Sequence, residues 1–450
     1  MKREDYFQEE GEIFYNVEMP LVAVLAYMEY CGVGFEVERL EANKEEVRKA
    51  IKKIEKEVNE MVGEELELNK NAKIAKILYD KLNLPKPNKK KEGKKKEMHP
   101  STDKKTLEGL IVRHPQHSKL LQKIVEWRKL SGIVDKHYNV LPSYACYEGE
   151  ELRMARVYPS IIPTCSATGR IGCKDPNLQC IPNPSFCSGV NINLRKSFVA
   201  AAGHVLLSVD YQQIEIRIMA FATKSPQLIQ ILSVEGADLF KKMAANWKKK
   251  REEEVSEEER TIIKQTVYGI LYGMGAHTCA SRLKVSVREA ENLMAQFHRT
   301  FPEINEWMKK VRENTARQRR VSTLLGRSRP IEIDQKGKWE RQCVNSVCQG
   351  TGADILKKAL INIYNQLVRL NLRSRILLPI HDELVCPFLL LSNSKFRHHF
   401  LKKKLLEVAN EELDVVKGMV VQEMENVFPG LRLPVSCESG YGRMKKRGQN

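Results

Sequence analysis

Residues Gly203–Thr223 read GHVLLSVDYQQIEIRIMAFAT, and this stretch changes its pattern at its single aspartate. Val205–Val209 is a short apolar run, which is typical of a buried strand. The residues that follow Asp210 favour a helix. We therefore expect a strand that turns directly into a helix, with Asp210 at the end of the strand.

A second stretch, RILLPIHDELVCPFLLL from Arg375, places two adjacent carboxylates between apolar runs. An uncompensated buried ion costs several kcal/mol, so Asp382 and Glu383 need either water or a positive partner. An exposed turn between two strands, with the acids facing water, is the simplest interpretation. If these strands join Val205–Val209 in one sheet, however, Asp382 meets Asp210 at the edge of that sheet.

A pair of aspartates at one sheet edge has a chemical consequence. Two carboxylates about 4 Å apart repel by roughly 4 kcal/mol at an effective dielectric near 20, so they need a cation between them. Carboxylates without histidine or cysteine ligands favour Mg²⁺, which binds one or two acids together with substrate phosphates. The pair therefore indicates two-metal phosphoryl transfer as a hypothesis.

The stretch ERTIIKQTVYGILYGMG, Glu259–Gly275, carries two cations and two tyrosines at intervals of four residues. Because an α-helix has about 3.6 residues per turn, this spacing puts four side chains on one broad face: Arg260, Lys264, Tyr268 and Tyr272. Cations for phosphates and rings for base and sugar suit a nucleoside triphosphate. An amphipathic surface helix with buried tyrosines is the alternative, although three glycines in seven residues weaken it by about 1 kcal/mol each.

A second helical stretch, ERQCVNSVCQGTGAD, repeats this spacing with Arg341, Asn345 and Gln349. All three side chains can donate hydrogen bonds toward one strip, as contacts to a minor groove or a sugar require. A solvated polar face is the alternative interpretation.

Composition narrows the class of protein. The 450 residues allow two or three domains, and 75 Lys+Arg against 57 Asp+Glu give a net charge of +18. This excess favours a polyanionic partner, nucleic acid before an anionic membrane surface. No apolar run reaches the roughly 18 residues of a spanning helix, and the acid-rich N-terminus is not a signal peptide. Eleven cysteines without a CxxC pair predict unlinked thiols rather than zinc or disulfides.

The order of patterns along the chain predicts an α+β fold. The first 80 residues and a stretch from Thr106 to about His137 favour helices, and loops with short strands follow. Helices dominate from Asp210 to about Leu370, apart from a turn at LLGRSRP, and the tail returns to strands. There is no internal repeat. We expect a small sheet with large helical additions.

Together these stretches resemble the motifs of family A DNA polymerases. Motif A is DYQQIEIR (Asp210–Arg217), motif B is RTIIKQTVYGILYG (Arg260–Gly273) and motif C is HDE (His381–Glu383). ATGR (Ala167–Arg170), DPNLQ (Asp175–Gln179) and LLGR also match in order. The resemblance extends from Phe14 to the C-terminus.

The resemblance implies a right-hand polymerase fold with a thumb, a palm that carries a small antiparallel sheet, and helical fingers. The implied divisions are N-terminal helices and thumb over 1–142, first part of the palm over 143–222, fingers over 223–357, and second part of the palm over 358–450.

The resemblance also implies a role for each site residue. The catalytic group is Asp210, Asp382, Glu383 and Lys264. Two Mg²⁺ ions, for which Mn²⁺ can substitute, are bound by Asp210, Asp382 and the carbonyl of Tyr211. The incoming deoxynucleotide is contacted by Arg260, Lys264, Tyr268, Tyr272, Glu215 and Gln213. The primer and template are contacted by Arg170, Gln179, Arg341, Asn345, Gln349 and His381.

The implied function is template-directed DNA synthesis from deoxynucleotides on a primer 3′-hydroxyl. No membrane is involved, and no protein partner is indicated. Because the thumb-like region begins almost at Met1, we expect no proofreading exonuclease. The pattern ADLFKKMAANWK is similar to the eukaryotic theta/nu branch, which implies DNA repair by end joining or lesion bypass in the nucleus.

Three alternatives remain open at this point. An organellar or replicative polymerase I-like enzyme, in a mitochondrion or plastid, shares the same motifs. A catalytically impaired DNA-binding relative is a different class of protein. A single-subunit RNA polymerase shares the two aspartates, but Glu215 and Glu383 favour DNA synthesis.

The sequence departs from the family pattern at several places. Phe240 replaces a usual histidine that contacts phosphate, Gln212 replaces a serine, and Cys180 replaces an asparagine. A larger departure follows motif C, where deletion of 386–406 restores the family pattern as HDELVEVANEELD. We expect this segment to be either a lineage-specific insertion or translated intron, and its presence puts activity in doubt.

Overall fold

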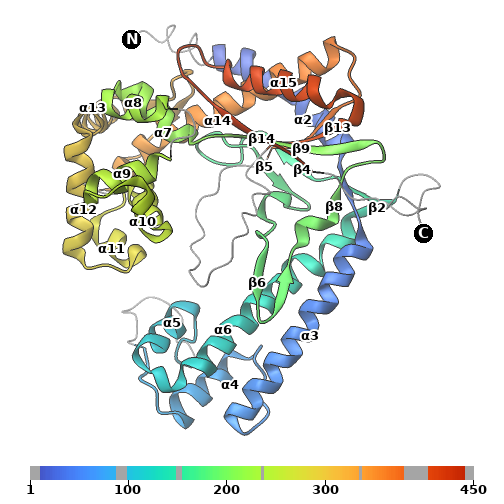
Figure 1. The fold of residues 1–450 in the computed structure, drawn as a ribbon, viewed down its shortest axis with the longest axis vertical. Helices are drawn as coiled ribbons and strands as arrows, with labels where there is room; N and C mark the ends of the chain where they lie inside the picture. The colour runs from blue at the N-terminus through green and yellow to red at the C-terminus, as the bar shows by residue number, and fades with distance from the viewer. Residues whose placement is uncertain are drawn as a thin grey trace.

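The structure is a computed structural model, and it describes residues 11–87, 99–147, 155–234, 238–333, 337–379 and 404–440. Motif C (His381, Asp382 and Glu383) and residues 386–403 of the predicted insertion lie outside the described residues. The architecture is α+β, as predicted: helices surround several small antiparallel sheets (Figure 1).

The central sheet has four strands in the order β12-β13-β9-β14, and each strand is antiparallel to its neighbours. The strands are β12 (Arg375–Leu378), β13 (Lys404–Ala409), β9 (His204–Tyr211) and β14 (Val435–Gly440). The predicted strand Val205–Val209 is confirmed as the buried middle of β9. Lys404–Leu406, the end of the segment whose deletion restores the family pattern, form the first half of β13.

One edge of this sheet collects the functional segments. β9 runs toward Tyr211, and the antiparallel β13 begins at Lys404, which pairs with Val209. β12 ends at Leu378, which pairs with Leu405. The chain therefore leaves the sheet after β12 and re-enters it at β13 on the side where β9 ends.

Helices cover the central sheet. The long helix α14 (Lys338–Arg369) packs with α2 (Met19–Cys31), α7 (Ile214–Thr223) and α15 (Leu413–Glu425) around the apolar side chains of β9 and β13 (Figure 1). The predicted passage from strand to helix is confirmed, since α7 starts three residues after Tyr211. Short pieces of sheet complete this region: β4 (Ser160–Ile162) with β5 (Gly172–Lys174), and β10 (Arg320–Ser322) with β11 (Ser328–Pro330).

A helical arm projects from this layer. It consists of α3 (Val37–Val62), α4 (Asn71–Lys76), α5 (Lys104–Arg113) and α6 (Ser118–Ile133) (Figure 1). α3 is amphipathic: Leu40, Val47, Ile54 and Val58 lie on its buried face. The single helix expected over 106–137 is divided near Pro115, because proline disfavours helical backbone at the preceding residue.

Small strands join the arm to the rest. β1 (Val33–Phe35) lies within the region predicted as helical, and it pairs with β3 (Ala155–Val157) and β8 (Phe198–Val199). The neighbouring strands are β2 (Ala145–Tyr147), β6 (Ser185–Cys187) and β7 (Val190–Ile192).

A second helical bundle lies to the left of the central sheet in Figure 1, and the helical arm lies below. It contains α8 (Pro226–Ser233), α9 (Leu239–Lys248), α10 (Glu257–Leu271), α11 (Ala276–Leu283), α12 (Val287–Thr300) and α13 (Pro302–Gln318). α10 starts at a capping box in which Ser256 and Glu259 bond reciprocally. The bundle has its own apolar cluster, which includes Phe240, Ile263 and Phe297.

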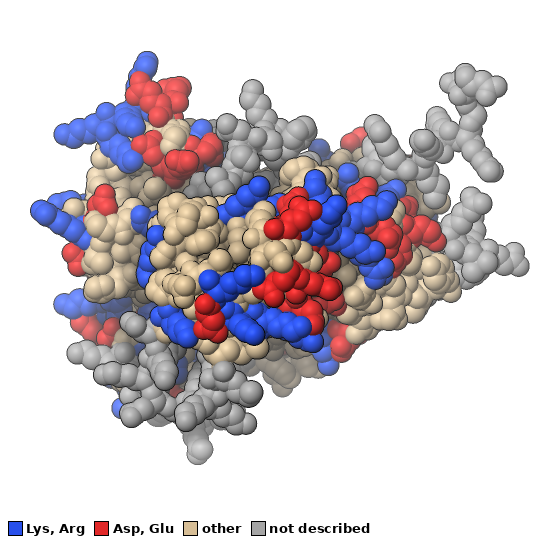
Figure 2. Space-filling model, turned by 90° about the horizontal axis from the view of Figure 1, so that it is seen from below, with Lys and Arg blue, Asp and Glu red and all other residues tan. Residues whose placement is uncertain are grey.

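Other features agree with the composition. The ten cysteines that the structure describes are free thiols, as their spacing predicted. Within the described ranges, no helix is both long and apolar enough to cross a membrane. Figure 2 looks at the molecule from the end that carries the helical arm, and it shows basic side chains interspersed with acidic ones.

Candidate active site

Asp210 occupies the penultimate position of β9, where its side chain is only partly buried. Its partner in the ladder is Ser436, and Val209 pairs with Cys437. Since side chains alternate across a strand, the Cys437 thiol points to the opposite face from Asp210. The next residue, Tyr211, is anchored in the core, where its hydroxyl donates to Met424 O at 3.1 Å. Burial raises the Tyr211 pKa, so this hydroxyl stays a donor.

The two expected metal ligands that the structure describes, Asp210 and Tyr211, offer oxygen atoms, from a carboxylate and a main-chain carbonyl. Such hard donors fit Mg²⁺ or Mn²⁺ better than a soft metal. Within the described ranges, no group of three or more His, Cys, Asp or Glu side chains forms a metal site of its own. Asp382, the second expected ligand, lies outside those ranges.

Glu215 lies in the first turn of α7, 5% exposed, with a cation and a hydroxyl around it. Arg170 Nη2 donates to Glu215 Oε1 at 2.9 Å, and the Tyr272 hydroxyl donates to Glu215 Oε2. Burial and the neighbouring carboxylate raise the Tyr272 pKa, so the phenol remains protonated. The structure thus brings together three predicted site residues from a loop, α7 and the end of α10.

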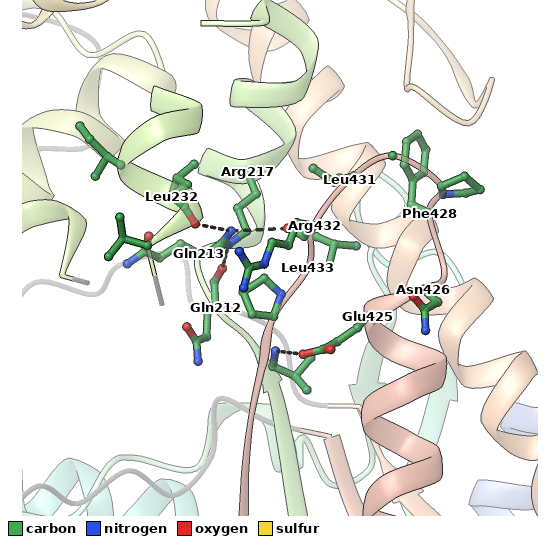
Figure 3. A pocket seen from close by; sticks show the side chains of 16 residues that line it. Gln212, Gln213, Arg217, Leu232, Glu425, Asn426, Phe428, Leu431, Arg432 and Leu433 are labelled. Carbon is green, nitrogen blue, oxygen red and sulfur yellow. Dashed lines mark hydrogen bonds between the residues drawn. The ribbon is translucent and has the colours of Figure 1, made fainter. Parts of the chain in front are cut away.

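The part of motif A between Asp210 and Glu215 borders a pocket of about 760 Å³, which lies between the end of α8 and the loop before β14 (Figure 3). Gln212 and Gln213 lie at its wall, and Gln213 has left-handed backbone with φ 55°. The buried guanidinium of Arg217 donates from Nε to Gln212 O at 2.9 Å and from Nη1 to Leu232 O at 3.3 Å (Figure 3). Burial and the charge of Arg432 lower the Arg217 pKa to about 10. Arg217 therefore holds motif A against the adjoining bundle.

The predicted face of α10 is present, and its four functional side chains are half-buried. The rings of Tyr268 and Tyr272 stack at 6.2 Å with an interplanar angle of 22°. Phe240 from α9 contacts Tyr268, with ring centroids 6.0 Å apart. Arg260 forms an ion pair with Asp238 at 2.5 Å.

The end of α10 packs closely on α14. Gly273 has φ +66°, and an added Cβ would lie 2.4 Å from Cγ of Arg341. Gly273 therefore permits both the turn and the approach of Arg341.

The α14 strip places its three predicted residues at different depths: Arg341 is exposed, Asn345 is half-buried, and Gln349 is 4% exposed. The alternative of a solvated polar face is therefore wrong for Gln349. Asn345 Oδ1 is buried and makes no hydrogen bond within the described residues, whereas the buried Gln349 amide lies beside the Tyr272 hydroxyl. Buried polar atoms rarely lack a partner, so Asn345 Oδ1 fits a contact to a ligand.

Gln179 contacts the end of the sheet near motif C. Its Nε2 donates to Pro379 O at 2.8 Å, immediately before the segment that carries His381. Gln179 thus approaches the end of the sheet where β12 and β9 end, whereas His381 itself lies outside the described residues.

A buried charge network, which the sequence patterns did not predict, lies beneath this site. Arg327 bonds Asp354 at 2.6 Å, and Lys357 Nζ donates to Glu18 at 2.7 Å. Burial alone would raise the Glu18 pKa, but its bonds to Lys357 and Arg327 lower it. The Arg327 side chain also lies against Gly169, two residues after Ala167 in the ATGR motif. The signals in the sequence were Arg327 in the LLGR motif and two charges, Asp354 and Lys357, on one turn of the helix α14.

The sequence model described as DNA polymerase family A matches residues 37–396. The chain belongs to DNA polymerase family A. DNA polymerase I, thermostable, of Thermus aquaticus is 31% identical over 437 residues, which cover 96% of this chain and 48% of that protein. DNA polymerase I of Caldicellulosiruptor bescii is 32% identical over 96% of this chain and 47% of that protein.

A solved structure also matches. The polymerase domain of Pol1 from M. smegmatis, in complex with DNA primer-template and dNTP, aligns with a TM-score of 0.79 and 27% identity. The match covers 95% of this chain and 70% of that chain. The right-hand polymerase fold is therefore confirmed. The chain spans about half the length of the curated relatives that it matches.

Proposed function

We propose that this chain carries out template-directed DNA synthesis, in which a primer 3′-hydroxyl attacks the α-phosphate of a deoxynucleoside triphosphate. One observation carries the proposal: Glu215, held by Arg170 and Tyr272, lies on the helix that directly follows the strand of Asp210. Glu215, which would border the nucleotide sugar, is therefore held close along the chain to the Asp210 carboxylate at the sheet edge. The proposed parts are thumb (1–142), palm (143–222 and 358–450) and fingers (223–357).

We assign Asp210, Asp382 and the Tyr211 carbonyl to two Mg²⁺ ions, with Mn²⁺ as a substitute and Glu383 as a nearby support. When bound, such ions lower the pKa of the primer hydroxyl and stabilise charge on the transferred phosphoryl group. Lys264 has a catalytic role, because a cation at the triphosphate offsets the negative charge that develops there.

The remaining residues bind and orient. Arg260, Lys264 and Gln213 contact the triphosphate, and Tyr268 stacks on the nucleotide. Tyr272 stands at the templating position, where its ring also stacks on Tyr268.

Glu215 excludes a 2′-hydroxyl. Because Arg170 and Tyr272 fix both of its oxygens, the carboxylate cannot move aside for an additional hydroxyl.

Contacts to primer and template are assigned to six residues: Arg170, Gln179, Arg341, Asn345, Gln349 and His381. The unpaired buried Oδ1 of Asn345 supports this assignment.

The finer proposals concern the biological role. The pattern ADLFKKMAANWK supports membership of the theta/nu branch, and hence DNA repair by end joining or lesion bypass in the nucleus. The alternative is an organellar or replicative enzyme of a mitochondrion or plastid. We further propose that the chain does not proofread. Incubation of the pure protein with a mismatched 3′ end, without nucleotides, should leave that end intact; its removal would contradict the proposal.

Primer extension on a defined template tests the central proposal. With Mg²⁺ and deoxynucleotides the primer should lengthen, and ribonucleotides should extend it far less. Asp210→Ala should abolish extension and preserve DNA binding. A chain that binds primer-template without extending it would instead be a catalytically impaired DNA-binding relative.

A further inference from the structure

Two residues at the start of α9 hold Arg260 from different sides. Asp238 Oδ2 accepts a hydrogen bond from Arg260 Nε at 2.5 Å. The Arg260 guanidinium carbon lies 6.0 Å from the centroid of the Phe240 ring, at the outer limit of a cation–π contact. About twenty residues separate these partners along the chain, so the packing of α9 on α10 creates the contacts.

Both partners of Arg260 are themselves fixed. Asp238 Oδ1 caps α9 by accepting from the main-chain nitrogens of Phe240 at 3.0 Å and Lys241 at 3.1 Å. The carboxylate therefore cannot turn without breaking the helix cap. Phe240 is 2% exposed and belongs to the apolar cluster of the bundle. Arg260 is thus attached to a rigid part of the molecule.

The geometry leaves the two Nη groups of Arg260 available for a ligand. Apart from Asp238, Glu257 is the described carboxylate within 4.0 Å of Arg260, at 3.9 Å from Nη1, and its side chain is 75% exposed. An exposed ion pair with this separation contributes little to stability. A guanidinium bound through Nε presents its two Nη groups as a fork, which matches two oxygens of a phosphate.

We propose that Asp238 and Phe240 are positioning residues that aim the fork of Arg260 at the triphosphate of the incoming nucleotide. This inference rests on the proposed function, and it adds two residues to which no role in nucleotide binding has been given. It also gives Phe240 a purpose at a place where the family usually carries a histidine: the ring supports a cation instead of supplying one.

The sign of one mutational effect separates positioning from simple electrostatics. Asp238 carries a negative charge close to where a strongly anionic triphosphate would bind. If the charge of Asp238 acted only by repelling the triphosphate, its removal would strengthen nucleotide binding. If Asp238 positions Arg260, its removal weakens binding, because the fork is no longer held in place.

The test measures both the equilibrium Kd for a fluorescent deoxynucleotide and steady-state extension of a primer by the full chain. Asp238→Asn keeps an oxygen to cap α9 but loses the charged acceptor. We expect the Kd and the KM for deoxynucleotide to rise about tenfold, the size of one charge-assisted hydrogen bond, with kcat changed less than about twofold. Phe240→Leu keeps apolar volume without the ring and should raise the KM about threefold.

Glu257→Gln is the matched control, because it removes a carboxylate from the same cation without a cap or a short bond. Its KM should stay level or fall. In an Arg260→Lys background, Asp238→Asn should add no further increase, since the fork is already lost. Melting temperatures of all variants should stay near that of the parent chain; if Asp238→Asn unfolds, Phe240→Leu decides, measured alone and in the Arg260→Lys background, where it should add no further increase.

Three outcomes would overturn the inference: a Kd that falls or stays level in Asp238→Asn, an equal rise in Glu257→Gln, or an undiminished Asp238→Asn effect in the Arg260→Lys background. Because the Kd needs no turnover, a chain that binds nucleotide but never extends a primer defeats the proposed function alone. A chain that extends primers normally with every Asp238 and Phe240 variant defeats only this inference.

Discussion

β9 and β13 lie side by side in the central sheet, but the chain reaches them in different ways. β9 ends at Tyr211 and continues into α7 after two residues, so the position of Asp210 follows from adjacent sequence. β13 pairs with β12, its predecessor in the chain, although residues 379–403 separate the two. The first strand is placed by local sequence, whereas the second is placed by its contacts within the sheet.

Those contacts lie in the second half of β13. Glu407 is completely buried, and its carboxylate accepts from Ala201 N at 2.6 Å and pairs with Arg156 at 3.2 Å. Arg156 in turn donates to Cys31 O at 2.7 Å. A misplaced register would leave these buried charges without partners, so Glu407 fixes the alignment of β13 with β9.

This alignment bears on the segment after motif C. Leu406 pairs with Leu207 in β9, and Lys404 pairs with Val209. If residues 386–406 were deleted, Val385 would precede Glu407 and take the place of Leu406, an apolar residue for an apolar residue.

The replacement of Leu406 by Val385 also has a consequence for catalysis. With Val385 in the place of Leu406, Asp382 would take the position just before that of Lys404 in the shortened chain. That position lies opposite Asp210 in the ladder. Residues directly opposite in a ladder have Cβ atoms roughly 5 Å apart. We therefore expect the deletion to preserve the sheet and to place two carboxylates at a distance that a bound cation can bridge.

The largest expected effect tests the locally placed strand. Asp210→Asn should reduce kcat for primer extension about 10³-fold, because a neutral amide cannot balance the charge of a metal ion at the sheet edge. Ser436→Ala, at the partner position, should change kcat less than about threefold. Single-turnover extension measures both variants. Near-normal synthesis by the Asp210→Asn variant would show that the end of β9 is not part of the active site.

The next effect tests the strand placed by contacts. Glu407→Ala should lower the free energy of unfolding by about 3 kcal/mol, since Arg156 keeps its charge in a buried site without its carboxylate. Glu407→Gln, which can still accept from Ala201 N, should cost about half as much. Urea denaturation gives both values. Equal and small losses would show that Glu407 does not fix the register.

Deletion of residues 386–406 tests the comparison directly. The shortened chain should fold and extend primers about 10²-fold faster than the full chain, because small displacements of catalytic groups carry penalties of that size. Asp382→Asn in the shortened chain should remove the gain.

A shortened chain that folds but is no more active would contradict the alignment argument. Separately, a sequenced transcript that contains the segment would exclude a translated intron and leave a lineage-specific insertion.

The smallest expected effect concerns Tyr211, the last residue of β9. Tyr211→Phe removes the donor to Met424 O and should lower the free energy of unfolding by about 1 kcal/mol with little change in kcat. Thermal denaturation together with primer extension tests this expectation. A large fall in kcat without loss of stability would mean that the hydroxyl acts in the reaction rather than in the core.

Particular residues show how far the sequence could predict the site. The interval of four residues along α10 predicted a face of cations and rings, and the stacking of Tyr268 on Tyr272 agrees with it. The ion pair of Arg260 with Asp238 was not predicted, because no periodic pattern links a helix cap to a residue on the next helix. Likewise, Glu215 gave no indication of its contact with Arg170, which lies 45 residues away.

The sequence by itself determined the family, the strand that ends at Asp210, the helix that follows it and the face of α10, because each depends on the order and spacing of neighbouring residues. Only the tertiary structure decided which side chains fix the site: Asp238 on Arg260, Arg170 and Tyr272 on Glu215, and Arg156 on Glu407. These partners meet because separate elements bury their apolar faces against one another. A buried charge must then take whichever partner that packing brings within reach.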